Sequence, residues 1–183
     1  MSEERDGWDD PFFNGSKSKW LNHCRSALRK QWTRYAPKIQ FMQANRFRMS
    51  VGRFKNGRKK SVWGAECNIC KGSFPMKQMQ VDHIEPAGEM KGLEGMGEFA
   101  SRLFCHRDNM QFLCKTCHNF KSIADRWDIT YEEAVRDAFY NETVKLPSIR
   151  QKRILEACGL SEWTHNKQSR DKAFKTLLKI NWK

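Results

Sequence analysis

Large apolar residues in the N-terminal third of the chain recur at roughly helical spacing. Between residues 17 and 35 they are Trp20, Leu21, Leu28, Trp32 and Tyr35. This spacing predicts an amphipathic helix from Lys17 to Tyr35. Pro37 predicts the start of a second helix, because proline fits a first helical turn and disfavours helix in the residue before it. Phe54 to Lys60, with Asn56-Gly57 inside it, predicts a turn or a mobile basic loop.

Beyond Cys67 the pattern changes to short segments separated by glycine and proline, followed by a helical C-terminal third. Met79 to Ile84 is rich in strand-forming residues and predicts a short strand, whereas residues 86–97 contain four glycines and predict a loop. Helices are expected over Lys115–Trp127, from the N-cap Thr130 onward, over Ser148–Cys158 and over Asn166–Ile180. The predicted fold class is therefore α+β and mainly helical.

Positive charge is concentrated in one part of the chain. The formal net charge is +13, and no Asp or Glu occurs from Pro11 to Ala65. Lysine and arginine gain affinity for nucleic acids by displacing counterions from phosphates, so a nucleic-acid partner is expected. A solvated charged face that binds nothing is the alternative. The residues expected to bind nucleic acid are Arg25, Arg29, Lys30, Arg34, Arg58, Lys59 and Lys60, joined on charge and location alone by Arg107 and Lys121.

The chain has no stretch of roughly 18 uncharged apolar residues, so no membrane span and no membrane partner are expected. Residues Met1 to Asp10 are acidic and polar, unlike a secretory signal, so a cytoplasmic location is expected. In a reducing compartment, paired cysteines are more often metal ligands than disulfides.

Four of the seven cysteines form two C-x-x-C pairs, Cys67 with Cys70 and Cys114 with Cys117. Each pair has the spacing that lets both thiolates reach one tetrahedral Zn²⁺. Four cysteine ligands leave zinc no open position, so this zinc is expected to be structural and to hold the ends of a central module together.

Other residues of this region carry chemistry that a purely structural zinc module does not need. Asp82 stands directly before His83, and His118 directly follows Cys117. On an extended strand these neighbours point to opposite faces, so Asp82 could bind a hard cation while His83 turns towards a water. Asp82 could instead orient His83 or cap a turn.

From Cys67 to Lys121, about a third of the chain, the sequence resembles the HNH endonuclease family in its four-cysteine version, common among phage-encoded and homing-type nucleases. The resemblance rests on elements in the family's order: C-x-x-C, Asp82-His83-Ile84 and Pro86, Asn109, Leu113-Cys114, Cys117-His118 and Lys121. It implies a small zinc-bound ββα-metal core, with Asp82 and His83 on a hairpin, Asn109 in a loop and His118 on a helix.

The resemblance implies a metal-dependent DNA endonuclease that hydrolyses phosphodiester bonds. His83 would be the general base, a role that suits histidine near neutral pH. Asp82 and His118 would bind one divalent ion, Mg²⁺, with Mn²⁺ or Ni²⁺ able to substitute, and Asn109 would position the His83 loop. Many relatives have a histidine where this chain has Asp82, and an aspartate favours a hard cation such as Mg²⁺.

Three regions are expected: a basic, mainly helical DNA-binding arm (1–62), a zinc-stabilised nuclease module (63–128) and a helical extension (129–183). The expected partner is double-stranded DNA, and the protein would act as a monomer or a homodimer. The competing hypothesis is a zinc-ribbon-like module that binds nucleic acid without cutting it. Such a module has no reason to assemble Asp82, His83, Asn109 and His118 in this order.

Overall fold

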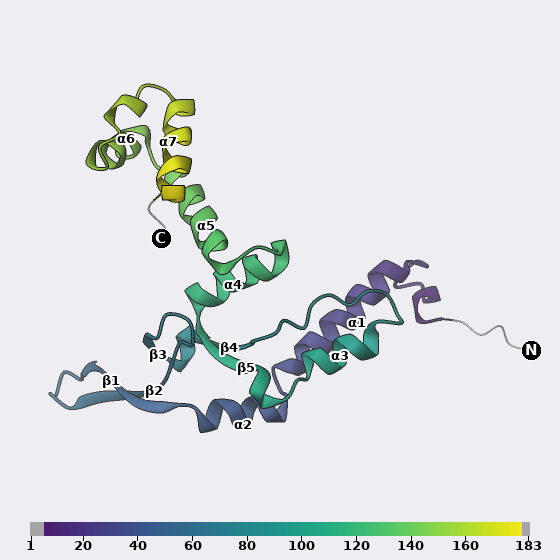
Figure 1. Ribbon diagram of the computed structural model, residues 1–183. Coiled ribbons are helices and arrows are strands. Elements are labelled where there is room, and N and C mark those ends of the chain that lie inside the picture. Colours follow the sequence, from purple (N-terminus) through teal and green to yellow (C-terminus); the bar gives the residue numbers. More distant parts are fainter. Residues whose placement is uncertain (1–5, 181–183) are drawn as a thin grey trace, which may run out of the picture. The chain divides into compact units, whose positions relative to one another are not determined.

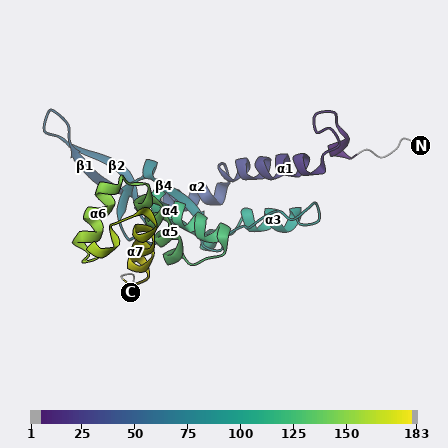
Figure 2. The same ribbon diagram turned by 90° about the horizontal axis from the view of Figure 1, so that it is seen from above.

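The computed structural model describes residues 6–180, with side chains up to residue 177 (Figures 1 and 2). The outermost residues of the predicted arm, 1–5, and of the predicted extension, 181–183, lie outside this part. The chain divides into two compact units, Met1–His118 (unit 1) and Asn119–Lys183 (unit 2). The division falls inside one helix, directly after His118.

Unit 1 contains both sheets of the described residues. Its elements are η1 (Gly7–Asp9), α1 (Lys17–Trp32), α2 (Ala36–Ala44), β1 (Phe47–Arg53), β2 (Lys59–Glu66), β3 (Ser73–Pro75), η2 (Met76–Gln78), β4 (Met79–His83), α3 (Met96–Leu103), η3 (Arg107–Asn109) and β5 (Met110–Cys114). Helix α4 (Lys115–Trp127) begins in unit 1 and continues into unit 2. The predicted α+β class, mainly helical, is confirmed.

Two small antiparallel sheets form the centre of unit 1. One has the order β1-β2-β3, and the other pairs β4 with β5. In the second sheet Met79 lies opposite Cys114, Asp82 opposite Gln111 and His83 opposite Met110. Strand β5 leads directly into α4, whereas α3 and η3 lie between β4 and β5 in the chain.

Unit 1 buries its apolar side chains in two clusters. The larger joins both sheets and three of the four paired cysteines, and Leu113 is fully buried in it. The smaller gathers Phe99 and Leu103 of α3 with Ala87. Trp32, at the end of α1, packs against both clusters. The N-terminal helix is therefore part of the packed structure of unit 1.

Several N-terminal predictions are confirmed, but the two strands β1 and β2 were not predicted. The first helix runs from Lys17 to Trp32, slightly shorter than predicted, and α2 has proline in its first turn. The turn predicted over residues 54–60 is present, with the Phe54 N–H donating to the Arg58 carbonyl over 2.8 Å. On either side of this turn, β1 and β2 form an antiparallel hairpin that the sequence pattern did not predict.

Unit 2 is entirely helical in its described part. After α4 it contains α5 (Tyr131–Lys145), α6 (Ser148–Ala157), η4 (Ser161–Trp163) and α7 (Lys167–Ile180), close to the predicted helices. Thr130 is the N-cap of α5, as predicted, and forms a capping box with Glu133. These hydrogen bonds from the backbone and the hydroxyl of Thr130 lower the pKa of Glu133.

A small apolar core holds these helices together. Leu155 of α6 and Phe174 of α7 are buried in it. Beside them Arg170 is also buried, and its Nε donates to the Gln151 side chain over 2.9 Å. None of the helices in the described residues is both long and apolar enough to cross a bilayer.

Replacing Leu155→Ala is expected to destabilise unit 2 by about 2–5 kcal/mol, because it removes buried methyl groups and leaves a cavity. Urea unfolding of the full chain, followed by circular dichroism, measures this change. Ile149→Ala on the same helix is the matched control, since Ile149 is 61% exposed. It is expected to change stability by less than about 0.5 kcal/mol. Equal effects of the two substitutions would contradict the assigned core.

Candidate metal centre and the adjoining pocket

The two predicted cysteine pairs come together in one cluster. The Sγ atoms of Cys67, Cys70, Cys114 and Cys117 all lie within 4.8 Å of one another. Cys70 is exposed, whereas the other three are buried. A tetrahedral zinc ion with Zn–S bonds of about 2.3 Å would need only a small inward movement of these thiols. The four cysteines could therefore bind one metal ion such as zinc.

Local backbone geometry prepares both pairs for this role. The chain turns tightly after Cys67, where the Lys71 N–H donates to the Cys67 carbonyl over 2.9 Å and Lys71 adopts a φ of 57°. The N–H of Cys117 donates to the Cys114 sulfur over 3.4 Å. Cys114 ends β5 and Cys117 lies in the first turn of α4, so one pair spans the strand-to-helix junction.

At Cys67, hydrogen bonds favour the thiolate, which is the form of cysteine that binds a metal ion. Burial alone would raise the pKa of Cys67, but backbone N–H groups of Cys114, Cys70 and Ile69 lower it to about 7. Stabilised thiolates are the form in which cysteine binds metal ions.

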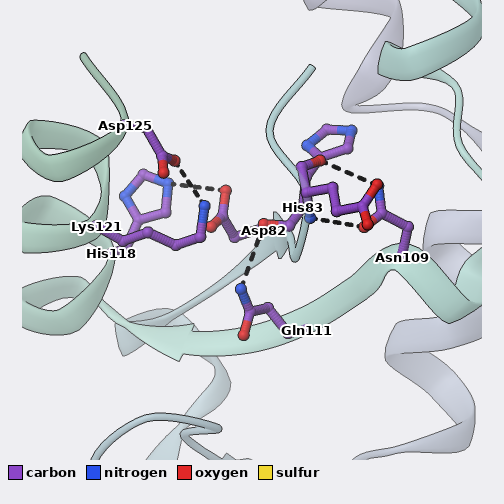
Figure 3. A network of polar contacts seen from close by, with 8 residues as sticks. Asp82, His83, Asn109, Gln111, His118, Lys121 and Asp125 are labelled. Carbon is purple, nitrogen blue, oxygen red and sulfur yellow. Dashed lines mark hydrogen bonds and ion pairs between the residues drawn. The ribbon is translucent and has the colours of Figure 1, made fainter. Parts of the chain in front are cut away.

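The predicted catalytic residues lie beside this cluster. Asp82 lies on β4 and His118 on the first turn of α4, next to Cys117. The Asp82 Oδ1 and His118 Nε2 atoms are 3.8 Å apart (Figure 3). Both side chains are mostly buried but still reachable, with exposed fractions of 19% and 29%. The structure therefore brings these two residues, predicted from the sequence as ligands of one ion, close together.

His83 is held by contacts on its edge and its face. Its Nε2 lies 2.9 Å from the Leu103 carbonyl oxygen. A carbonyl oxygen can only accept, so Nε2 carries the proton and Nδ1 keeps the lone pair in the neutral ring. The Trp32 ring stacks on the imidazole with centroids 4.4 Å apart and planes at 26°. These contacts fix both the tautomer and the plane of the ring.

Two amide side chains hold the backbone around His83 (Figure 3). Asn109 accepts from the Glu85 N–H over 2.7 Å and donates to the Glu85 carbonyl over 3.1 Å. Gln111, which is buried, donates to the His83 carbonyl over 3.3 Å and accepts from Asn68 over 3.1 Å. The backbone at His83 and at Glu85, two residues later, is therefore held by side chains from the η3–β5 segment.

A pocket of about 400 Å³ joins these residues. Its lining includes Asp82, His83 and His118, together with Arg29 of α1 and Lys38 of α2. Burial lowers the pKa of Lys38, and burial followed by repulsion from Arg25 lowers that of Arg29. These cations have lost part of their hydration, so an anion entering the pocket would interact with them strongly.

The other predicted nucleic-acid-binding residues lie in several places. Arg29 lines the pocket, whereas the Arg107 guanidinium donates to the Gln40 side chain over 3.1 Å. The Lys121 ammonium donates to Asp125 over 2.6 Å within α4. The remaining six residues lie on or just after α1, or at the tip and second strand of the β1–β2 hairpin: Arg25, Lys30, Arg34, Arg58, Lys59 and Lys60.

The sequence pattern did not predict four groups of the site: Trp32, Lys38, Gln111 and the Leu103 carbonyl. In the sequence, Trp32 is one apolar position of a helix and Lys38 is one of the cations of the basic arm. Their contacts with the site join residues distant in the chain, and no local pattern marks such contacts. Gln111 lies two residues after Asn109 in a predominantly apolar strand, and a buried amide there was the available signal.

Comparison with known proteins finds no family model, no curated protein and no solved structure that matches this chain.

The full chain is expected to bind one zinc ion, and Cys114→Ser is expected to lose it and unfold much of unit 1, because both sheets meet at the cluster. Elemental analysis of purified protein and thermal unfolding measure the two effects. Cys158→Ser is the matched control, since Cys158 is exposed and lies in unit 2. A wild-type zinc content retained by the Cys114 variant would contradict the proposed ligand set.

Proposed function

We propose that this protein is a metal-dependent DNA endonuclease that hydrolyses phosphodiester bonds. The observation that carries the proposal is the joint placement of Asp82, His83 and His118 in one pocket with two cations. Their order along the chain also agrees with the resemblance to HNH nucleases, since Asp82 and His83 lie on strand β4 and His118 lies on helix α4. In this proposal the four cysteines beside the pocket bind a structural zinc ion.

Asp82 and His118 would hold the catalytic divalent ion. Two metal–ligand bonds of about 2.1 Å can bridge atoms up to about 4.2 Å apart, and the two ligand atoms are separated by 3.8 Å. A carboxylate in this pair favours Mg²⁺. The bound ion would supply Lewis-acid stabilisation of charge on the scissile phosphate and the leaving oxygen.

His83 would act as the general base. The Leu103 carbonyl holds the proton on Nε2, so the lone pair of Nδ1 is the one that can accept a proton from water. Stacking against Trp32 prevents rotation of the ring, and reactivity requires such positioning of the base.

Asn109 would be a positioning residue. Its two hydrogen bonds to the Glu85 backbone fix the segment that leaves β4 directly after His83. Arg29 and Lys38 would hold the phosphate, since they line the same pocket as the proposed base and metal ligands.

His83→Ala is expected to reduce nicking or linearisation of supercoiled plasmid in Mg²⁺ by about 10²–10⁴-fold, because a positioned base contributes that much. Agarose gels of plasmid incubated with the full chain, with and without added Mg²⁺, measure this. The variant should still retard DNA on a native gel.

His165→Ala is the matched control, because His165 is an exposed histidine of unit 2. It is expected to cut at the wild-type rate. Wild-type protein that binds plasmid without cutting it at any Mg²⁺ concentration would refute the nuclease and support a non-catalytic nucleic-acid-binding protein. Loss of DNA binding together with cutting in His83→Ala would count against the assigned base.

Asp82→Asn is expected to raise the Mg²⁺ concentration for half-maximal cleavage by at least about tenfold. Even the substitution of residues that only hydrogen-bond to a metal ligand lowers metal affinity by roughly 10–100-fold. A titration of cleavage rate against Mg²⁺ measures this, with Asp137→Asn, an exposed acid on α5, as control. An unchanged Mg²⁺ requirement with a lower maximal rate would show that Asp82 orients a neighbour instead of binding the ion.

A further inference from the structure

The outer part of the β1–β2 hairpin is a two-stranded ribbon that no other element of unit 1 covers. All residues from Ser50 to Ser61 are exposed, and the pair formed by Met49 and Val62 is the last that is half-buried. In Figures 1 and 2 the turn end of this ribbon extends away from the other elements of unit 1. Both of its faces are therefore available to a partner.

The ribbon and its base carry only positive charge. No acidic residue occurs from Pro11 to Ala65, so no carboxylate within the ribbon offsets its cations. The cations between residues 46 and 63 are Arg46, Arg48, Arg53, Lys55, Arg58, Lys59 and Lys60. A surface with this many cations and no anion attracts a polyanionic partner.

Strand register divides the ribbon into two different faces. Arg48 lies opposite Trp63, and Ser50 opposite Ser61, so these side chains share a face. After a bulge at Gly52, which has a φ of 108°, Arg53 lies opposite Lys59. Lys59 and Ser61 are two residues apart on β2, so their side chains point to the same face of the ribbon. The face that carries Arg48, Ser50 and Ser61 therefore also carries Lys59, and it is rich in hydrogen-bond donors. Met49 and Val62 occupy the other face.

Ring contacts hold the cations at the base of the ribbon. The guanidinium carbons of Arg46 and Arg48 lie 4.3 and 4.8 Å from the centre of the Trp63 ring. At the turn, the Arg53 guanidinium donates to the Gly57 carbonyl over 2.9 Å. Cations held in this way lose less side-chain entropy when they bind a partner.

We propose that this ribbon docks in the major groove of duplex DNA with its donor-rich face, Arg48, Ser50, Arg53, Lys59 and Ser61, towards the base edges. The major groove of B-DNA, about 12 Å wide, admits a two-stranded ribbon, and arginine or lysine pairs with O6 and N7 of guanine. The deep, narrow major groove of A-form RNA does not admit it. The proposal rests on the proposed nuclease function, for which the ribbon would select the duplex that enters the pocket.

The test compares three full-length, zinc-loaded proteins that all carry His83→Ala, without added Mg²⁺. One has no further change, one adds R48Q/R53Q/K59Q on the ribbon, and one adds K145Q/K152Q/R153Q as a control of equal charge on exposed sites of unit 2. Fluorescence anisotropy with a labelled 30-base-pair duplex gives affinity and its salt dependence. Methylation by dimethyl sulfate reports protection of guanine N7 in the major groove and adenine N3 in the minor groove.

The ribbon variant is expected to bind at least tenfold more weakly and to lose guanine N7 protection, while the control keeps N7 protection and stays within threefold of the parent. Circular dichroism and zinc content should match in all three proteins. A ribbon variant within twofold of the parent, protection confined to adenine N3, or equal competition by duplex RNA of the same sequence would overturn the proposal.

A cleavage assay of a protein that carries the same three ribbon substitutions but keeps His83 separates the two proposals. Intact N7 protection in a protein that never cuts would refute the nuclease and leave the ribbon assignment standing. Wild-type cutting and wild-type affinity in the ribbon variant would refute the ribbon assignment and leave the nuclease standing.

Discussion

The fold of unit 1 depends on the meeting of four cysteine sulfurs at the junction of two small sheets. Strand β3 has three residues and the second sheet has only two strands, and such elements are marginal without further support. Cys67 follows β2 and Cys114 ends β5, so a metal held by these thiols would fasten one sheet to the other. Three of the four cysteines also belong to the larger apolar cluster, so a metal bound there would stabilise the same region as core packing does.

This constraint also determines where the candidate chemistry lies. Cys117 and His118 are neighbours on the first turn of α4, and Met79, at the start of β4, lies opposite Cys114. Fixing the sulfurs therefore fixes the distance between the helix that carries His118 and the strand that carries Asp82 and His83. Gln111 and Asn109 then hold the backbone around His83 from the neighbouring segment. The candidate catalytic residue His118 thus directly follows the candidate metal ligand Cys117, and Asp82 and His83 lie on the strand that pairs with the one ending at Cys114.

Local sequence patterns predicted the elements that are defined by local rules. Helix α4 has the predicted bounds, Thr130 caps α5, and the four cysteines converge as their spacing implies. The β1–β2 hairpin was missed because exposed strands lack the apolar alternation that identifies strands, and because its arginines and lysines also occur in helices. The stacking of Trp32 on His83 could not be predicted for another reason. It depends on how distant parts of the chain pack together, and the residues next to Trp32 or His83 in the sequence do not indicate it.

The contact between Trp32 and His83 has a consequence for how such a protein can change over time. Helix α1 belongs to the basic segment, yet its last residue forms one wall around the imidazole, and Arg29 one turn earlier lines the same pocket. Helix α1 cannot be replaced independently of the rest of unit 1, because a different helix would remove the Trp32 ring that packs against His83. In the proposed nuclease, a substitution that tilts α1 towards a new nucleic-acid contact would also change the orientation of the His83 ring, so DNA recognition and catalysis would have to evolve together.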